Sequence, residues 1–182
     1  TDIDGLSDSK LAGTDFTGSL LLGHQTTGTL DAATYNTGVG LTALDALTTG
    51  DHNTAVGYAA LTSNTTGTKN TAYGYDALYT NGAGAANVGI GFQSLRSNTG
   101  GGSNIAIGFA SFYSNTTSYY NTAIGRSSLQ YANRTADSDG YNTALGSYAG
   151  NTGTNNITTG NKNTLLGAST AASAAAGTNQ SV

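Results

Sequence analysis

A glycine recurs at a fixed spacing along most of the chain, and this period constrains the fold more than any other feature. Successive glycines are 17 residues apart from Gly23 to Gly125 and then 21 apart up to Gly167. The set is Gly23, Gly40, Gly57, Gly74, Gly91, Gly108, Gly125, Gly146 and Gly167. A period of this length is typical of repeat proteins, in which each repeat contacts mainly its neighbours. We therefore predict an elongated stack of about nine coils.

The composition excludes several classes of protein. Charged residues make up 9% of the 182 residues, against roughly 25% in average globular proteins. The net charge of −4 gives no basic surface for nucleic acid. The absence of cysteine rules out disulfides and thiolate metal sites. No apolar run approaches the roughly 20 residues of a membrane span, so we expect no membrane insertion.

Each repeat contains a short strand. We number the repeat from a recurring asparagine, Asn53 for example, so that the glycine is position 5. Position 3 is small, position 4 is bulky and apolar, and this alternation with period 2 is typical of a strand. The position-4 row consists of Leu22, Val39, Val56, Tyr73, Ile90, Ile107, Ile124, Leu145 and Leu166.

The alternation assigns the two faces of this strand. We expect the small residues at position 3, the glycines and a recurring leucine at position 9 to fill the lumen of a narrow coil. The position-4 row would then lie on the outside, where a continuous apolar stripe predicts an association surface. Self-association around a symmetry axis is the simplest way to bury it.

The asparagines at position 1 predict a ladder of side-chain amides along the stack. The later Asn-Thr-Thr-Gly stretch, for example at Asn64, is interpreted as an outer turn. Asn64, Asn115 and Asn133 also match glycosylation acceptors. Because turns rich in Asn and Thr produce this match by chance, we do not predict glycosylation.

The segment from Asn53 to Gly67 (NTAVGYAALTSNTTG) resembles the head repeats of YadA-like trimeric autotransporter adhesins and the longer repeats of bacteriophage tail fibres. The resemblance covers roughly residues 19–170. It implies a left-handed parallel β-roll assembled as a parallel homotrimer, with the position-4 row on the axis and the outer loops facing a host or neighbouring surface. The repeat is longer here than in YadA-type heads, and nothing resembles their stalk or membrane barrel, which favours a tail fibre or a fragment.

The chain is expected to have three parts. Residues 1–18 break the period and predict an N-terminal cap or connector. Residues 19–170 form the repeat domain, with insertions in the loops 131–141 and 150–162. Residues 171–182 are small, polar and aperiodic, and we interpret them as a linker to a further part of a longer protein.

The residues that could carry chemistry are few and scattered. His24 and His52 have no partner at metal-ligand spacing, so no metal or cofactor is expected. The carboxylates form no row, although Asp137 and Asp139 share one long loop. We interpret the aspartates as solvated turn residues and the protein as not an enzyme.

One group of aromatic residues is a candidate binding surface. Tyr119, Tyr120, Tyr131 and Tyr141 lie in neighbouring repeats, with Arg134 close in sequence. Exposed rings there would suit adhesion to sugars or apolar patches. The alternative is that the rings pack across the longer loop.

The sequence thus predicts a non-enzymatic trimeric fibre segment, a structural spacer and attachment module from a phage tail fibre or a surface adhesin. Its partners would be its own copies and a glycan or protein on a host or neighbouring cell, and its location extracellular. Two alternatives remain open: a monomeric solenoid binder such as an ice-binding protein, and a polysaccharide-degrading fibre.

Overall fold

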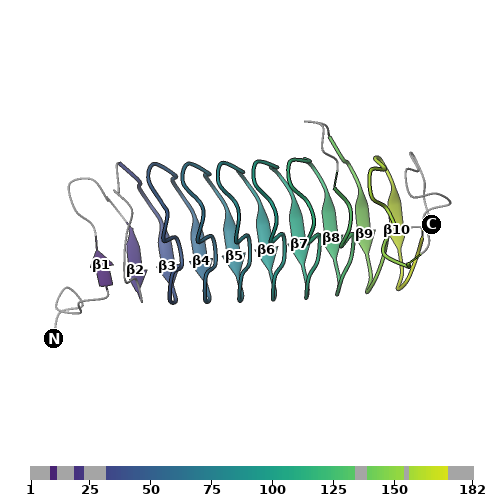
Figure 1. The fold of residues 1–182 in the computed structure, drawn as a ribbon, viewed down its shortest axis with the longest axis horizontal. Coiled ribbons are helices and arrows are strands. Elements are labelled where there is room, and N and C mark those ends of the chain that lie inside the picture. Colours follow the sequence, from purple (N-terminus) through teal and green to yellow (C-terminus); the bar gives the residue numbers. More distant parts are fainter. Residues whose placement is uncertain (1–8, 12–18, 23–31, 134–138, 154–155, 172–182) are drawn as a thin grey trace.

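The protein is an all-β parallel solenoid, seen here in a computed structural model that describes residues 9–11, 19–22, 32–133, 139–153 and 156–171. About eight turns of chain join the parallel strands, and the described residues contain no helix. The coils stack into a rod with all their strands on one side (Figure 1). The predicted solenoid is therefore confirmed.

The strands form one 10-stranded sheet in chain order. They are β1 (Ser9–Leu11), β2 (Leu20–Leu22), β3 (Thr37–Val39), β4 (Thr54–Val56), β5 (Thr71–Tyr73), β6 (Val88–Ile90), β7 (Ile105–Ile107), β8 (Thr122–Ile124), β9 (Thr143–Leu145) and β10 (Thr164–Leu166). From β2 onward all neighbours are parallel, and equivalent residues pair, as Ala55 does with Ala72. β1 instead pairs antiparallel with β2, Ser9 opposite Leu22.

The lumen is filled as the alternation predicts. The middle residue of every strand from β2 to β10 is buried, from Leu21 to Leu165. The position-9 side chains, among them Leu61 and Leu95, are also fully buried, and Phe112 takes that place in one coil. Small residues on the strand leave room for the larger ones opposite, so a narrow coil reaches close packing.

The recurring glycines lie at the turn after each strand and not in the lumen. Gly74 has a φ of 130° and is half-buried. A Cβ added there would lie 2.7 Å from the carbonyl oxygen of Gly91 in the next coil. Both the backbone conformation and the close approach of successive coils require glycine. Gly23 lies outside the described residues.

The rest of each coil turns through residues in the left-handed region. These residues recur at positions 7, 9 and 17, as in Asp76, Leu78 and Lys69, with φ of 53°, 52° and 60°. Their backbone groups bond from coil to coil: the Asp76 amide donates to the Tyr58 carbonyl at 3.0 Å. Backbone pairing therefore continues beyond the short strands.

The predicted ladder at position 1 is present. The Asn104 Nδ2 donates to Asn87 Oδ1 at 3.1 Å and to the Ser118 carbonyl at 2.8 Å. The Asn104 backbone amide also donates to Asn87 Oδ1, at 3.1 Å. Asn104 thus joins two coils and closes its own coil.

A second ladder occupies the stretch interpreted as an outer turn, and that interpretation is wrong for its asparagines. Asn64, Asn81, Asn98 and Asn115 are fully buried. Each Nδ2 donates to the Oδ1 of the preceding member, at 2.8, 2.6 and 2.7 Å. Of the threonines that follow, Thr66 and Thr99 are exposed, whereas Thr65, Thr116 and Thr117 are half-buried.

Candidate functional site

The outer face of the sheet is a strip of apolar side chains. Position-4 side chains point away from the lumen, and the largest exposed fractions are 59% for Tyr73, 45% for Leu145 and 65% for Leu166. The position-2 residues share this face. They are Leu20, Thr37, Thr54, Thr71, Val88, Ile105, Thr122, Thr143 and Thr164. The face therefore combines one apolar row with a row of threonine and aliphatic residues.

A row of stacked aromatic rings borders one end of the strands, and the sequence analysis missed it. The described position-6 row consists of Leu41, Tyr58, Tyr75, Phe92, Phe109, Arg126, Ser147 and Ala168. The ring centroids from Tyr58 to Phe109 are 5.0, 5.2 and 5.1 Å apart, and the planes differ by 16° or less. The Arg126 Cζ lies 5.5 Å from the centroid of Phe109. A large ring directly after the glycine in four successive repeats was the available signal.

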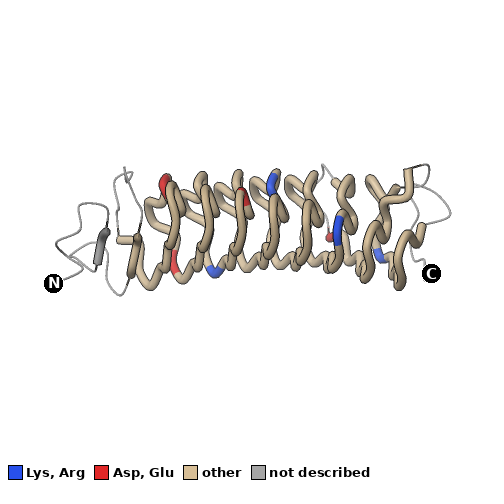
Figure 2. Tube along the Cα trace, turned by 90° about the horizontal axis from the view of Figure 1, so that it is seen from below, with Lys and Arg blue, Asp and Glu red and all other residues tan. Residues whose placement is uncertain are grey.

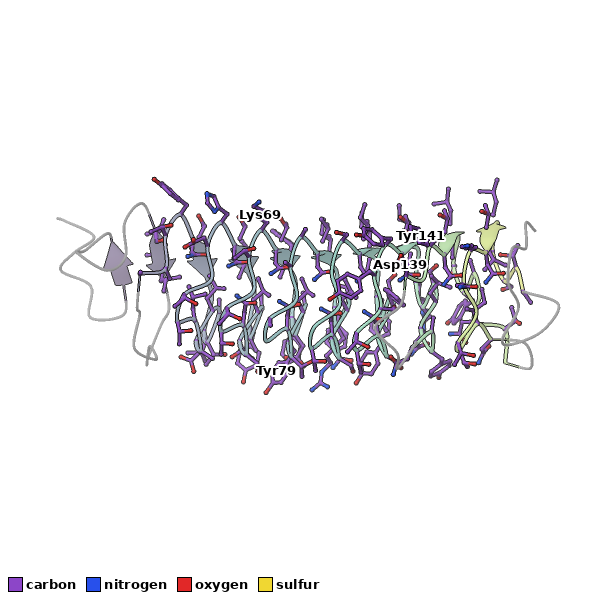
Figure 3. The ribbon with its side chains drawn as sticks, turned by 90° about the horizontal axis from the view of Figure 1, so that it is seen from above. Lys69, Tyr79, Asp139 and Tyr141 are labelled. Carbon is purple, nitrogen blue, oxygen red and sulfur yellow. The ribbon has the colours of Figure 1, made fainter. Side chains whose placement is uncertain are left out.

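A mixed row borders the other end of the strands. The residue directly before each position-1 residue is at position 17 of a 17-residue coil or position 21 of a 21-residue coil. This position-17 row consists of Tyr35, His52, Lys69, Ala86, Ser103, Tyr120, Tyr141 and Lys162. Tyr35 stacks on His52 and Tyr120 stacks on Tyr141, both with centroids 5.1 Å apart. Figure 3 shows Lys69 and Tyr141 on the side of the molecule where the strands lie.

The face opposite the sheet carries one polar cluster. The Arg96 Nε lies 3.2 Å from the Asp76 Oδ2, and its guanidinium lies 4.8 Å from the Tyr79 centroid and 5.9 Å from that of Tyr113. Tyr79 projects away from the strands (Figure 3). Burial lowers the pKa of Arg96, but the hydrogen bond to Asp76 and the neighbouring acidic groups raise it by more. Asp76 is buried, so its interpretation as a solvated turn residue is wrong.

The predicted tyrosine group is only partly brought together. Tyr120 contacts both Tyr141 and Tyr119. The Tyr119 hydroxyl donates to the Gly100 carbonyl at 3.0 Å. Tyr131 is exposed and stacks on none of the described rings. Arg134 lies outside the described residues.

The pKa of Tyr141 is raised, first by a hydrogen bond with Asp139 and then by partial burial and the charge of that carboxylate. Figure 3 shows these two side chains close together. Because the phenol donates to Asp139, a local contact fixes the Tyr141 side chain.

Charged and metal-ligating groups do not gather in the described part of the chain. Lysine, arginine and aspartate are scattered along the rod (Figure 2). No group of three histidine or acidic side chains there could hold a metal ion. Asp51 is engaged by the amide and hydroxyl of Thr34, at 2.6 and 2.9 Å. His24, Asp31 and Asp137 lie outside the described residues.

The asparagines of the three glycosylation motifs lie in buried or half-buried surroundings. The Asn64 and Asn115 side chains have no exposed surface; the Asn64 Nδ2 donates to the Gly67 carbonyl of its own coil and the Asn115 Nδ2 to Asn98 Oδ1 of the preceding coil. Asn133 is half-buried, and its Oδ1 accepts from the Thr116 amide and hydroxyl at 3.1 and 2.8 Å. A glycan on Asn64 or Asn115 would therefore disrupt the buried ladder.

Comparison of this chain with protein-family models, with curated proteins and with solved structures finds no match. The described residues include no helix with the length and apolarity needed to cross a membrane.

Proposed function

We propose that this chain is a segment of a trimeric fibre in which the position-4 row of each copy faces a common threefold axis. The observation that carries the proposal is the apolar strip on the outer face of the sheet, from Val39 to Leu166. Backbone and asparagine hydrogen bonds run from coil to coil and leave this strip outside the core. Exposed apolar patches of such continuity mark interaction surfaces.

The size of the strip supports an assembly with further contacts. A fully buried aliphatic side chain contributes about 1.5–3 kcal/mol. Since these residues are already partly covered, the row supplies on the order of 5–10 kcal/mol per chain. Association costs roughly 4–15 kcal/mol in lost freedom. The row alone is therefore close to balance, and a stable trimer needs contacts beside it.

The resemblance to YadA-like heads and tail fibres supplies the number of chains and the left-handed coil in this proposal. The fibre would act as a non-enzymatic spacer outside the cell, on a virion or a bacterial surface, and attach to a glycan or protein of a host or neighbouring cell. In such a trimer the face with Tyr79, Arg96 and Tyr113 would point outward and be available for attachment.

The proposed assembly is tested by the molar mass in solution from light scattering after size exclusion. Three chains of 18.1 kDa give 54.3 kDa. Ile107→Asp would place three carboxylates at the axis, so we expect a folded monomer by mass and circular dichroism. Thr66→Asp, on an exposed turn, is the control and should keep the trimer. A monomeric wild-type protein would refute the proposal.

The two alternative functions receive less support. A flat array for ice would repeat threonine in every coil, but Leu20, Val88 and Ile105 replace it in three coils and Tyr73 projects from the face. A polysaccharide-degrading fibre would need two positioned carboxylates, and Asp76 is instead held by Arg96. Release of reducing sugars from capsule by the wild-type protein would instead support the polysaccharide-degrading fibre.

A further inference from the structure

We propose that the two rows at the ends of the strands pair between neighbouring chains, position 6 of one copy against position 17 of the next, at the same level of the rod. This inference rests on the proposed threefold assembly. It names the second copy of the chain as the partner of the stacked aromatic row.

The geometry of a threefold prism brings these two rows together. In each coil they are six positions apart with the strand between them, as with Ala86 and Phe92. Six steps of at most about 3.3 Å give a sheet face no more than about 20 Å wide, because the chain turns at Gly91. Three such faces enclose a triangle whose sides lie only about 6 Å from the axis, which is the reach of an aliphatic side chain. The corners of this triangle are where position 6 meets position 17.

The stacking of the rings argues for this partner over a sugar. The planes of Phe92 and Phe109 differ by 6° at a centroid distance of 5.1 Å. Their faces therefore cover one another, and mainly their edges are presented outward, although both residues are at least 40% exposed. A sugar would stack on an open face, whereas a row of ring edges fits an apolar protein surface of the same repeat.

The sizes of the two rows are complementary at the same level. A rotation about an axis parallel to the rod keeps every residue at its own height, so residues of the same coil meet. Phe92 then faces Ala86, and Phe109 faces Ser103. The two phenylalanine rings thus meet Ala86 and Ser103, the two smallest residues of the position-17 row.

The charges of the two rows are complementary too. At the same level Lys69 faces Tyr75, and Arg126 faces Tyr120. Each cation can lie on an aromatic ring of the neighbouring chain. A shift by one coil in one direction sets Phe109 against Tyr120, and in the other direction sets Arg126 against Ser103. Of the three registers, only the level pairing gives both phenylalanines a small partner and gives Lys69 and Arg126 each a ring, while Lys162 then faces Ala168.

Paired cysteines test this arrangement, since the chain contains no cysteine of its own. The double variant Ala86→Cys and Phe92→Cys places two cysteines at opposite ends of a strand, roughly 20 Å apart. They cannot form a disulfide within one chain, because a disulfide needs about 4.4–6.8 Å between the two Cα atoms. Between chains each copy would link to both neighbours. We expect mild oxidation to give a covalent trimer on a denaturing gel, reversed by reductant.

The matched control combines Phe92→Cys with Tyr120→Cys, which displaces one partner by two coils, about 9.6 Å along the rod. This pair should give little covalent trimer. If light scattering shows the trimer but the matched pair links no better than this control, the edge pairing is wrong and the trimer stands. If Phe92→Cys links better to Ser103→Cys than to Ala86→Cys, the level is wrong. A wild-type monomer would instead remove the proposed function itself.

A steric variant gives an independent readout. Ser103→Tyr adds a ring where Phe109 of the neighbour would pack. The coil accepts tyrosine at this position, because Tyr35, Tyr120 and Tyr141 occupy it elsewhere with similar φ. We expect at least tenfold weaker trimerisation by sedimentation with unchanged circular dichroism, whereas Thr66→Tyr should have no effect. Unchanged trimerisation of Ser103→Tyr would contradict the pairing.

Discussion

Replacing one buried amide by a carboxyl tests how the asparagine ladder holds the coils together. Asn104→Asp keeps the shape of the side chain and its accepting oxygen, which receives the amide and Nδ2 of Asn121 at 3.0 Å. It replaces the nitrogen that donates to Asn87 Oδ1 at 3.1 Å and to the Ser118 carbonyl at 2.8 Å. An oxygen would then face two acceptors in a site with no exposed surface.

The magnitude follows from those two lost bonds. A buried polar group left without its partner costs about 1–3 kcal/mol, and more when a charge is involved. Among the described residues, the Ser118 carbonyl would keep only the 3.4 Å contact from Asn115. We therefore expect a loss of about 3–5 kcal/mol at neutral pH, which is a large part of the stability of an ordinary domain.

The variant also predicts a pH dependence with a definite sign. Burial among acceptors favours the protonated form of the introduced carboxyl, so its pKa is raised in the folded state. The difference from wild type should be smallest below the unfolded value of about 3.9 and should grow as the pH rises through the folded pKa.

Urea unfolding followed by circular dichroism, at one fixed chain concentration, measures both effects. The control is Asn161→Asp, at a half-exposed site, which we expect to change stability by no more than about 0.5 kcal/mol. Equal stability of Asn104→Asp and this control at pH 7, or a defect that deepens on acidification, would refute the assignment of the amide as a donor.

Two further predictions concern single positions. Gly74→Ala should destabilise the coil by about 1–3 kcal/mol from its φ of 130° alone, and by more from the contact with Gly91. The control is Gly100→Ala, whose added Cβ meets no atom within 4 Å and which should be neutral or stabilising by up to about 1 kcal/mol. Equal midpoints of the two variants in urea unfolding would contradict this prediction. Asp139→Asn should lower the pKa of Tyr141 toward its ordinary value, because the hydrogen bond to the Asp139 carboxylate raises this pKa and would be weakened. NMR titration of the labelled tyrosine measures the pKa, and an unchanged value would show that the bond does not cause the shift.

The strand and its two faces could be predicted from the sequence because they follow period 2. Ala55 and Ala72 alternate with Val56 and Tyr73, and burial follows the same alternation. The glycine spacing likewise fixed which residues are equivalent. These features are local, so one repeat contains the information and the others repeat it.

The rest of the coil could not be predicted in the same way. Its path depends on left-handed residues such as Leu61 and Phe112, which carry no glycine or asparagine signal. Asn64 looked like a turn residue because its partner Asn81 lies a full coil away. Asp76 looked solvated because Arg96 is 20 residues distant. Contacts between coils decide these positions, and a local pattern does not display them.

The direction of the bonds explains why this rod would need a partner at its sides. Backbone amides, both asparagine ladders and the stacked rings all form contacts along the rod, from one coil to the next. The outward residues at position 4 are apolar, and threonine hydroxyls such as that of Thr54 alternate with them at position 2. Lateral association would therefore combine apolar burial and ring edges with these hydroxyls, and apolar burial gives little register on its own because it is non-directional. Bulky and small residues placed at defined levels, as Phe92 and Ala86 are, would supply that register.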